Sequence, residues 1–149
     1  MNRNTLKKWL FLTIKYVAWA PIAVFILHVV TSKIFHLYAL WPEFDIPMHI
    51  LGGVVISYFF NGSYHIANRL RLLGQPARYL QPIMVFALGS TATIFWEFAE
   101  FTSDQVFGTH MQGGLEDTLL DMLLGMVGTY CMLLLVNIQQ KKIDSKFPH

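Results

Sequence analysis

The chain has 149 residues, of which 54% are hydrophobic and only 13% are charged, and its formal net charge is +2. A soluble domain carries about 25% charged residues, so this composition excludes an ordinary soluble protein and favours an integral membrane protein. The lone cysteine, Cys131, excludes an intramolecular disulfide. We expect the lipid bilayer as the main partner and no nucleic acid.

Four apolar segments predict transmembrane helices. They run from about 9 to 31, 46 to 65, 81 to 101 and 117 to 137. Each has close to the roughly 20 residues that cross a hydrocarbon core. The second segment is the least apolar, because Asn61, Ser63 and His65 make one of its ends polar. We therefore expect an all-α protein, a single domain over residues 1–149 that forms a four-helix membrane bundle.

Lysine and arginine are unevenly distributed between the predicted spans. They gather before the first span, between the second and third, and after the fourth: Arg3, Lys7, Lys8, Arg69, Arg71, Arg78, Lys141, Lys142 and Lys146. The two remaining loops hold only Lys33. Basic residues mark cytoplasmic segments, so both termini are predicted to face the cytoplasm.

Acidic residues gather at the opposite, outer ends of the spans. Eight of the nine lie there: Glu43, Asp45, Glu97, Glu100, Asp104, Glu116, Asp117 and Asp121. Spacings of three, four and seven residues place the acids of each helix on one face, and His49 shares the face of Asp45. Such carboxylates are costly at the edge of a bilayer unless something satisfies them, so the cluster predicts a site.

Small and polar residues continue these faces toward the middle of the spans. They are Gly52, Gly53 and Ser57 in the second span, Ser90 and Thr93 in the third, and Gly125 and Gly128 in the fourth. Small residues let membrane helices approach closely. The predicted bundle therefore has an acidic cup at its outer mouth.

A divalent cation is the expected ligand of this cup, because clustered carboxylates cannot all stay ionised without one. Oxygen ligands with an imidazole suit Mg²⁺, Mn²⁺, Fe²⁺, Zn²⁺ or Ca²⁺. The predicted metal ligands are His49, Glu97, Glu100, Asp117 and Asp121. Residues expected to support them or to touch a substrate are Asp45, Asp104, His110 and Glu116.

Structural roles compete with this interpretation. Asp45 and Asp117 fall where helices begin, so capping explains them equally well. Glu97 and Asp121 lie about one turn inside their spans, where a functional role is favoured. Proton-shared carboxyls or hydrogen bonds between helices are the alternative to a metal. The glycine-rich segment 108–114 fits either a lid over the cup or a plain connector.

Several motifs resemble those of the YjdF-like bacterial inner-membrane proteins. They are Trp96-Glu97-Phe98-Ala99-Glu100, Gly108, Gln112-Gly113-Gly114-Leu115-Glu116-Asp117-Thr118, Asp121-Met122 and Gly125, with the earlier pair Asp45 and His49. Gly114 stands where that family commonly has an acid. A looser similarity links Glu100 and Asp121 to VanZ-like four-span proteins. The resemblance implies a bacterial inner-membrane location and an acidic site, but no reaction.

Three functions fit these observations. The first is a metal-dependent enzyme acting on a lipid or lipid-linked substrate at the outer leaflet. The second is a binding or transport protein for a cation or small molecule, which with four spans would need to form a homo-oligomer. The third is a structural subunit of a membrane complex. No nucleophile with an activating histidine is evident, so the catalytic residues stay unassigned.

Overall fold

The computed structural model describes residues 3–146, and side chains from 3 to 136, and every regular element in this part of the chain is helical. The prediction of an all-α protein is confirmed. In chain order the elements are α1 (Arg3–Tyr16), α2 (Trp19–Val29), the π-helix η1 (Val30–Ile34), α3 (Leu37–Leu40), the 3₁₀-helix η2 (Pro42–Phe44), α4 (Asp45–Arg69), α5 (Leu80–Phe107) and α6 (Leu115–Lys146).

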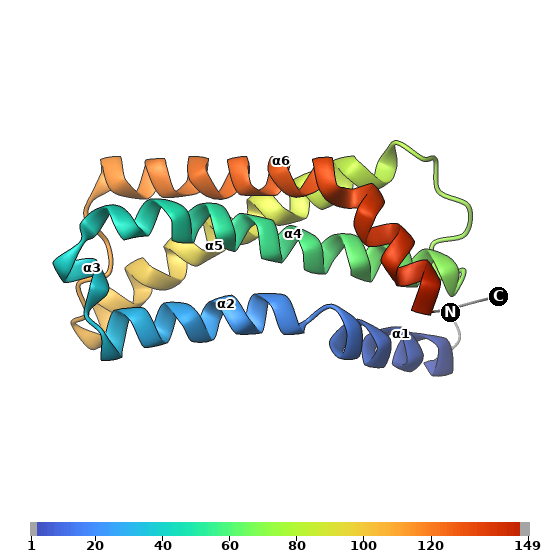
Figure 1. The fold of residues 1–149 in the computed structure, drawn as a ribbon, viewed down its shortest axis with the longest axis horizontal. Helices are drawn as coiled ribbons and strands as arrows, with labels where there is room; N and C mark the ends of the chain where they lie inside the picture. Colours follow the sequence, from blue (N-terminus) through green and yellow to red (C-terminus); the bar gives the residue numbers. More distant parts are fainter. Residues whose placement is uncertain (1–2, 147–149) are drawn as a thin grey trace.

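Helices α2, α4 and most of α6 lie along the long axis of the molecule, and α5 is inclined to them (Figure 1). Helix α4 is the central element, since it packs against α1, α2, α5 and α6. The start of α1, the connection 70–79 and the end of α6 lie at one end of the molecule, and α3 and the connection 108–114 lie at the other. The segments richest in basic residues and those richest in acids are thus at opposite ends. That the basic end is cytoplasmic stays a prediction.

Among the described residues, two helices are long and apolar enough to cross a membrane, namely α5 and the stretch Leu115–Val136 of α6. A third span is counted if α1 and the run Trp19–Ile34 are taken together, although they meet at a bend of 48°. The prediction of one continuous helix over 9–31 is therefore wrong in one detail, because the structure has a break within this range. The break comes from Pro21, which has no N–H to bond the carbonyl of Val17 and whose ring crowds that carbonyl.

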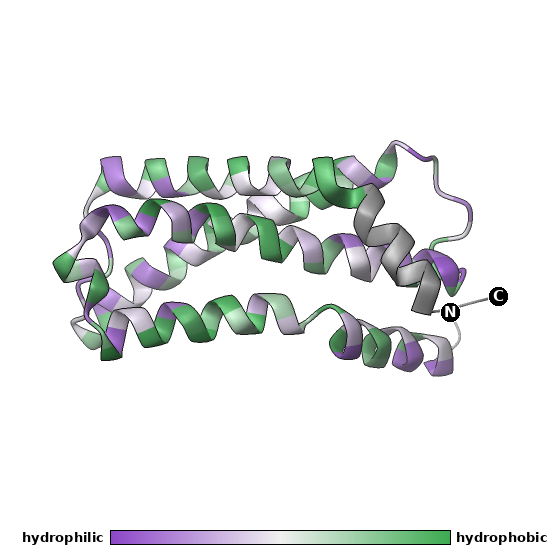
Figure 2. Ribbon diagram, in the orientation of Figure 1, coloured by the Kyte–Doolittle hydropathy of each residue, from purple (hydrophilic) through white to green (hydrophobic). Residues whose placement is uncertain are grey.

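Helix α4 is not among these candidate spans. Its 25 residues extend about 37 Å at 1.5 Å per residue, enough to cross a bilayer. Because other helices surround it, its buried residues include Ser57 and Asn61. Apolar residues predominate along the middle of α2 and α6, and polar ones gather toward the ends of the helices (Figure 2). That α4 is a span stays a prediction.

Glycines bring α4 and α6 into close contact, as the stripe of small residues predicts. A Cβ added at Gly53 would overlap the carbonyl of Gly125, and one added at Gly128 would overlap the carbonyl of Ile50. One turn further along α4, the Ser57 hydroxyl donates a hydrogen bond of 3.0 Å to Oγ1 of Thr129. These contacts fix the position of α6 along the axis of α4.

Candidate functional site

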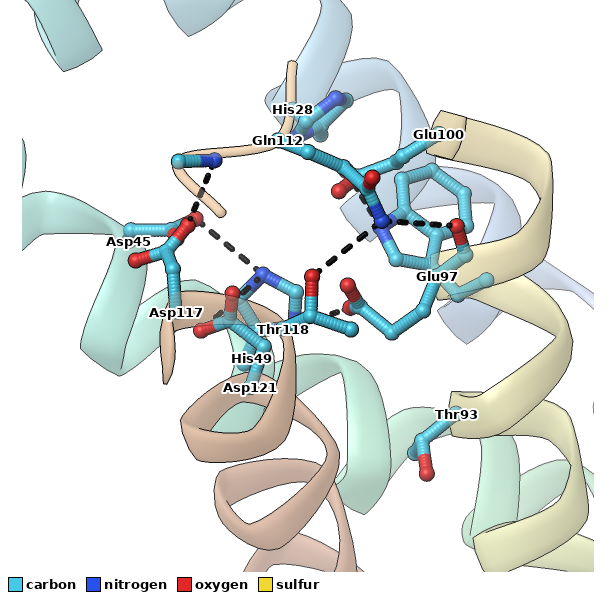
Figure 3. Close-up of polar contacts among 12 residues, drawn as sticks. His28, Asp45, His49, Thr93, Glu97, Glu100, Gln112, Asp117, Thr118 and Asp121 are labelled. Atoms are coloured by element: carbon cyan, nitrogen blue, oxygen red, sulfur yellow. Dashed lines mark hydrogen bonds and ion pairs between the residues drawn. The ribbon is translucent and has the colours of Figure 1, made fainter. Parts of the chain in front are cut away.

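The imidazole of His49 lies among carboxylates from three helices (Figure 3). Its Nε2 is 3.2 Å from Oδ1 of Asp45, one turn earlier on α4, and 3.6 Å from Oδ1 of Asp121 on α6. The three residues each offer a ligand atom, and these atoms lie within 4.8 Å of one another. Asp121 is 3% exposed, whereas Asp45 is only partly buried. The group is therefore compact and open on the side of Asp45.

Glu97 approaches the same ring from α5. Its Oε1 lies 3.7 Å from Nδ1 of His49, on the ring edge away from Asp45 and Asp121. The Glu97 residue is 2% exposed, and Oε1 has no hydrogen-bond partner among the described residues. A buried carboxylate oxygen without a hydrogen bond is costly. The site thus contains an unsatisfied polar atom directed at its central imidazole.

Glu100 is buried one turn beyond Glu97, but it has a partner on its own helix. The indole Nε1 of Trp96 donates a hydrogen bond of 2.8 Å to its Oε1. Trp96 also packs edge-on against His28, with ring centroids 5.3 Å apart. Glu100 was expected among the ligands. The structure gives it a tryptophan partner and leaves it outside the group formed by Asp45, His49 and Asp121.

Asp104 holds the connection 108–114 in place. Its carboxylate accepts hydrogen bonds from the Thr109 hydroxyl and from the backbone N–H groups of Met111 and Gln112, over 2.5 to 3.1 Å. The connection begins at Gly108, whose φ of 63° ends α5 in the left-handed conformation that glycine adopts readily. Asp104 is thus an anchor of the loop.

Asp117 stands in the first turn of α6 and accepts a hydrogen bond of 3.0 Å from the backbone N–H of Gly113. This contact corresponds to the capping role that the sequence left open. His110 and Glu116, expected near the ligands, are exposed. The structure thus groups His49, Glu97 and Asp121 of the predicted ligands, and it adds Asp45, which was expected only to support them.

Sequence reasoning named Gln112 only within a motif and gave it no place in the site, although it links the connection to the site. Its side-chain Nε2 lies 3.2 Å from Oγ1 of Thr118 and 3.4 Å from the backbone carbonyl of Glu97. It also missed Tyr38, whose hydroxyl is 2.9 Å from Nδ1 of His28. Burial, and then the nearby Asp45, raise the pKa of Tyr38 to about 12, so this hydroxyl keeps its proton. Neither residue belongs to a periodic pattern that could have indicated it.

A cavity of about 270 Å³ adjoins the His49 group. It lies among α2, α4 and α5, and Asp45 and His49 form part of its wall. Most of the lining is apolar. No sequence pattern pointed to this space, because it depends on how far α2 stands from α5.

Comparisons with known proteins agree with a membrane protein. Residues 5–142 match the model of a family described as "Predicted membrane protein (DUF2238)". A curated protein of Thermotoga maritima, named as an uncharacterized protein, is 31% identical over 112 residues, which are 71% of this chain and 54% of that protein. The chain thus spans about half the length of that relative. No solved structure matches. Since the family model covers most of its length, this chain belongs to the DUF2238 family of predicted membrane proteins.

Proposed function

We propose that this chain is a multi-pass protein of the bacterial inner membrane that binds one divalent cation through Asp45, His49 and Asp121. The observation that carries the proposal is the convergence of three ligand atoms within 4.8 Å. Two carboxylates and an imidazole suit Mn²⁺, Fe²⁺ or Zn²⁺, with Mg²⁺ and Ca²⁺ as harder alternatives. A cation there would offset the repulsion between Asp45 and Asp121.

Glu97 supports this assignment from the other edge of the ring. Histidines that bind a metal through one nitrogen commonly donate the other N–H to a carboxylate, which orients the ring. Oε1 of Glu97 faces Nδ1 at 3.7 Å, while Asp45 and Asp121 face Nε2. Glu97 therefore has the role of positioning His49 rather than of a ligand. Glu100 keeps its hydrogen bond from Trp96, and Asp117 keeps its hydrogen bond from Gly113.

Catalysis on a lipid or lipid-linked substrate is the use of the cation that we propose. Three protein ligands leave coordination positions free, which is typical of catalytic rather than structural sites. A cation so held can polarise a phosphoryl or carbonyl oxygen, or activate water. Conduction of the cation along α4 and α6 is disfavoured, because Gly53 and Gly125 close that path by backbone contact.

The topology that accompanies this function is a bundle of four spans with both termini in the cytoplasm. Helix α4 supplies the additional span, shielded by its neighbours. The cation site then faces the outer leaflet. The motif resemblance to YjdF-like proteins supports the same location.

Binding of Mn²⁺ to the detergent-purified, metal-stripped protein tests the cation site, with the decrease of the free-ion electron paramagnetic resonance signal as the readout. Wild type should bind about one ion per chain, the number that one compact ligand group supports. Asp121→Asn and His49→Gln should abolish binding. Glu97→Gln should weaken it by about 10- to 100-fold, the usual effect of changing the partner of a metal-bound histidine.

Glu116→Gln is the matched control, because it removes an exposed acid at the same end of the molecule. It should bind Mn²⁺ like wild type. Equal loss of Mn²⁺ binding in Glu116→Gln and Asp121→Asn would show that the effect arises from general surface charge. Undiminished binding in Asp121→Asn would sink the assignment, as would the absence of binding of Mn²⁺, Zn²⁺ or Fe²⁺ to well-folded wild type.

A further inference from the structure

The lining of the cavity beside His49 follows α4 over several turns. Along α4 its lining extends from Asp45 to Ile56, a length of about 16 Å at 1.5 Å per residue. Its apolar wall is formed by Pro21 and Val24 of α2, Val55 and Ile56 of α4, and Ala92 of α5. Its charged and imidazole groups, Asp45, His49 and His28, lie toward one end, and Thr93 is a further polar residue of the lining. An apolar length with a polar end matches the two parts of a lipid.

Gly52 gives the cavity its width. A Cβ added at Gly52 would meet no atom within 4 Å, although the residue lines the cavity. Its neighbour Gly53 is the opposite case, since it lies against the backbone of α6. Two adjacent glycines thus serve different faces of α4. Close packing explains Gly53, and it does not explain the open space at Gly52.

The cavity lies where bilayer lipid can reach it. Apolar side chains of α2 and α5 that are next in sequence to lining residues are exposed, among them Ile22, Ile26 and Phe95. Between α2 and α5 the ring contacts are those of Trp96 with Phe25 and His28, at centroid distances of 6.1 and 5.3 Å. These rings stand at the polar end, beside His49, and the cavity is partly open. An unfilled apolar space of this size would forfeit dispersion contacts.

We propose that this cavity binds an acyl chain of a bilayer glycerophospholipid, with the headgroup at Asp45 and His49. The proposal rests on the proposed function in one respect, because a cation at those residues would attract the lipid phosphate. It adds the substrate class and the route, since the chain would enter sideways from the bilayer between α2 and α5. The hydrocarbon chain itself needs only the apolar lining.

Photo-crosslinking with a phosphatidylethanolamine that carries a diazirine at the middle of one acyl chain tests the proposal. The full-length protein is reconstituted in nanodiscs with this lipid, irradiated, and mapped by peptide mass spectrometry. Adducts are expected on Val24, Ile56 and Ala92, in addition to those on exposed faces. Gly52→Leu should lose the adducts on these lining residues, because the leucine side chain fills the cavity.

Ala87→Leu is the control, since it introduces the same leucine side chain at an exposed position of α5. It should keep the adducts on the lining residues. Ala92→Leu, which narrows the cavity from the opposite wall, replaces Gly52→Leu if that variant elutes as an aggregate. Adducts confined to exposed faces in wild type would overturn the proposal, as would equal labelling of the lining residues in wild type and in folded cavity-filling variants.

Asp121→Asn separates this proposal from the cation site. It should lose Mn²⁺ and keep the acyl-chain adducts, whereas Gly52→Leu should keep Mn²⁺ and lose the adducts. Adducts on the lining residues without Mn²⁺ binding in wild type would leave the chain site standing and overturn the metal assignment. Mn²⁺ binding without these adducts would leave the metal assignment standing and overturn the acyl-chain site.

Discussion

His49 is the residue on which the site depends, because both of its ring nitrogens face carboxylates. Asp45 and Asp121 share one nitrogen and Glu97 takes the other. The helical spacing of Asp45 and His49 made their contact predictable. Which of the remaining acids reach the ring was not predictable, because Asp121 and Glu97 belong to other helices. Glu100 and Asp117 are also carboxylates and lie one turn nearer the ends of α5 and α6, yet local partners hold them elsewhere.

Asp104 offers a prediction at the scale of one residue. Asp104→Ala removes the acceptor of the hydrogen bonds that hold the connection 108–114. We expect faster cleavage within this connection in limited proteolysis of the reconstituted protein, with Mn²⁺ binding retained. Glu116→Ala, which changes an exposed acid after the connection, should be cleaved like wild type. Unchanged cleavage of Asp104→Ala would show that other contacts hold the connection.

At the scale of the elements, α4 is the helix around which the others are arranged. One face meets α6 through Gly53, and another opens to the cavity at Gly52. The sequence indicated the small residues and the helices that carry them. It did not indicate that Gly53 packs against α6 while Gly52 lines the cavity, since that difference depends on the rotation of α4 about its axis. The break before α2 was not predicted, since the apolar run over 9–31 indicates one continuous helix, and the bend angle depends on packing.

The adjacent glycines allow a paired test of this packing. Gly53→Ala should destabilise the protein by about 1–3 kcal/mol, the usual cost of overpacking, because the methyl group meets the Gly125 carbonyl. Gly52→Ala should be neutral or stabilising by up to about 1 kcal/mol, since it gains helix propensity without a clash. Unfolding by sodium dodecyl sulfate in mixed micelles measures both. Equal effects would contradict the assigned rotation of α4.

At the scale of the whole molecule, charge separates the two ends. The connection 70–79 lies at the basic end, and the connection 108–114 at the acidic end. The sequence predicted this separation of charge well, because the prediction needs only the order of the segments and the alternating direction of successive helices. The cavity could not be predicted, since it depends on the distance between α2 and α5.

Single cysteines test the proposed topology. In a Cys131→Ser background, Glu43→Cys should react with a membrane-impermeant maleimide in spheroplasts, because it precedes α4 at the outer end. Gln75→Cys, in the connection after α4, should react only after permeabilisation. Labelling of both from the same side would show that α4 does not cross the membrane, and it would leave the contacts of His49 unaffected.

The enclosed position of α4 bears on how the protein is made. A helix that carries Ser57 and Asn61 at its buried face gains little by entering lipid alone. Its best partners, α5 and α6, are synthesised after it. We expect a nascent chain stalled near residue 79 to leave α4 outside the hydrocarbon core, and a chain extended beyond α6 to draw it in. The proposed cation site would then be assembled in the last step of insertion, when the acids of α5 and α6 reach His49.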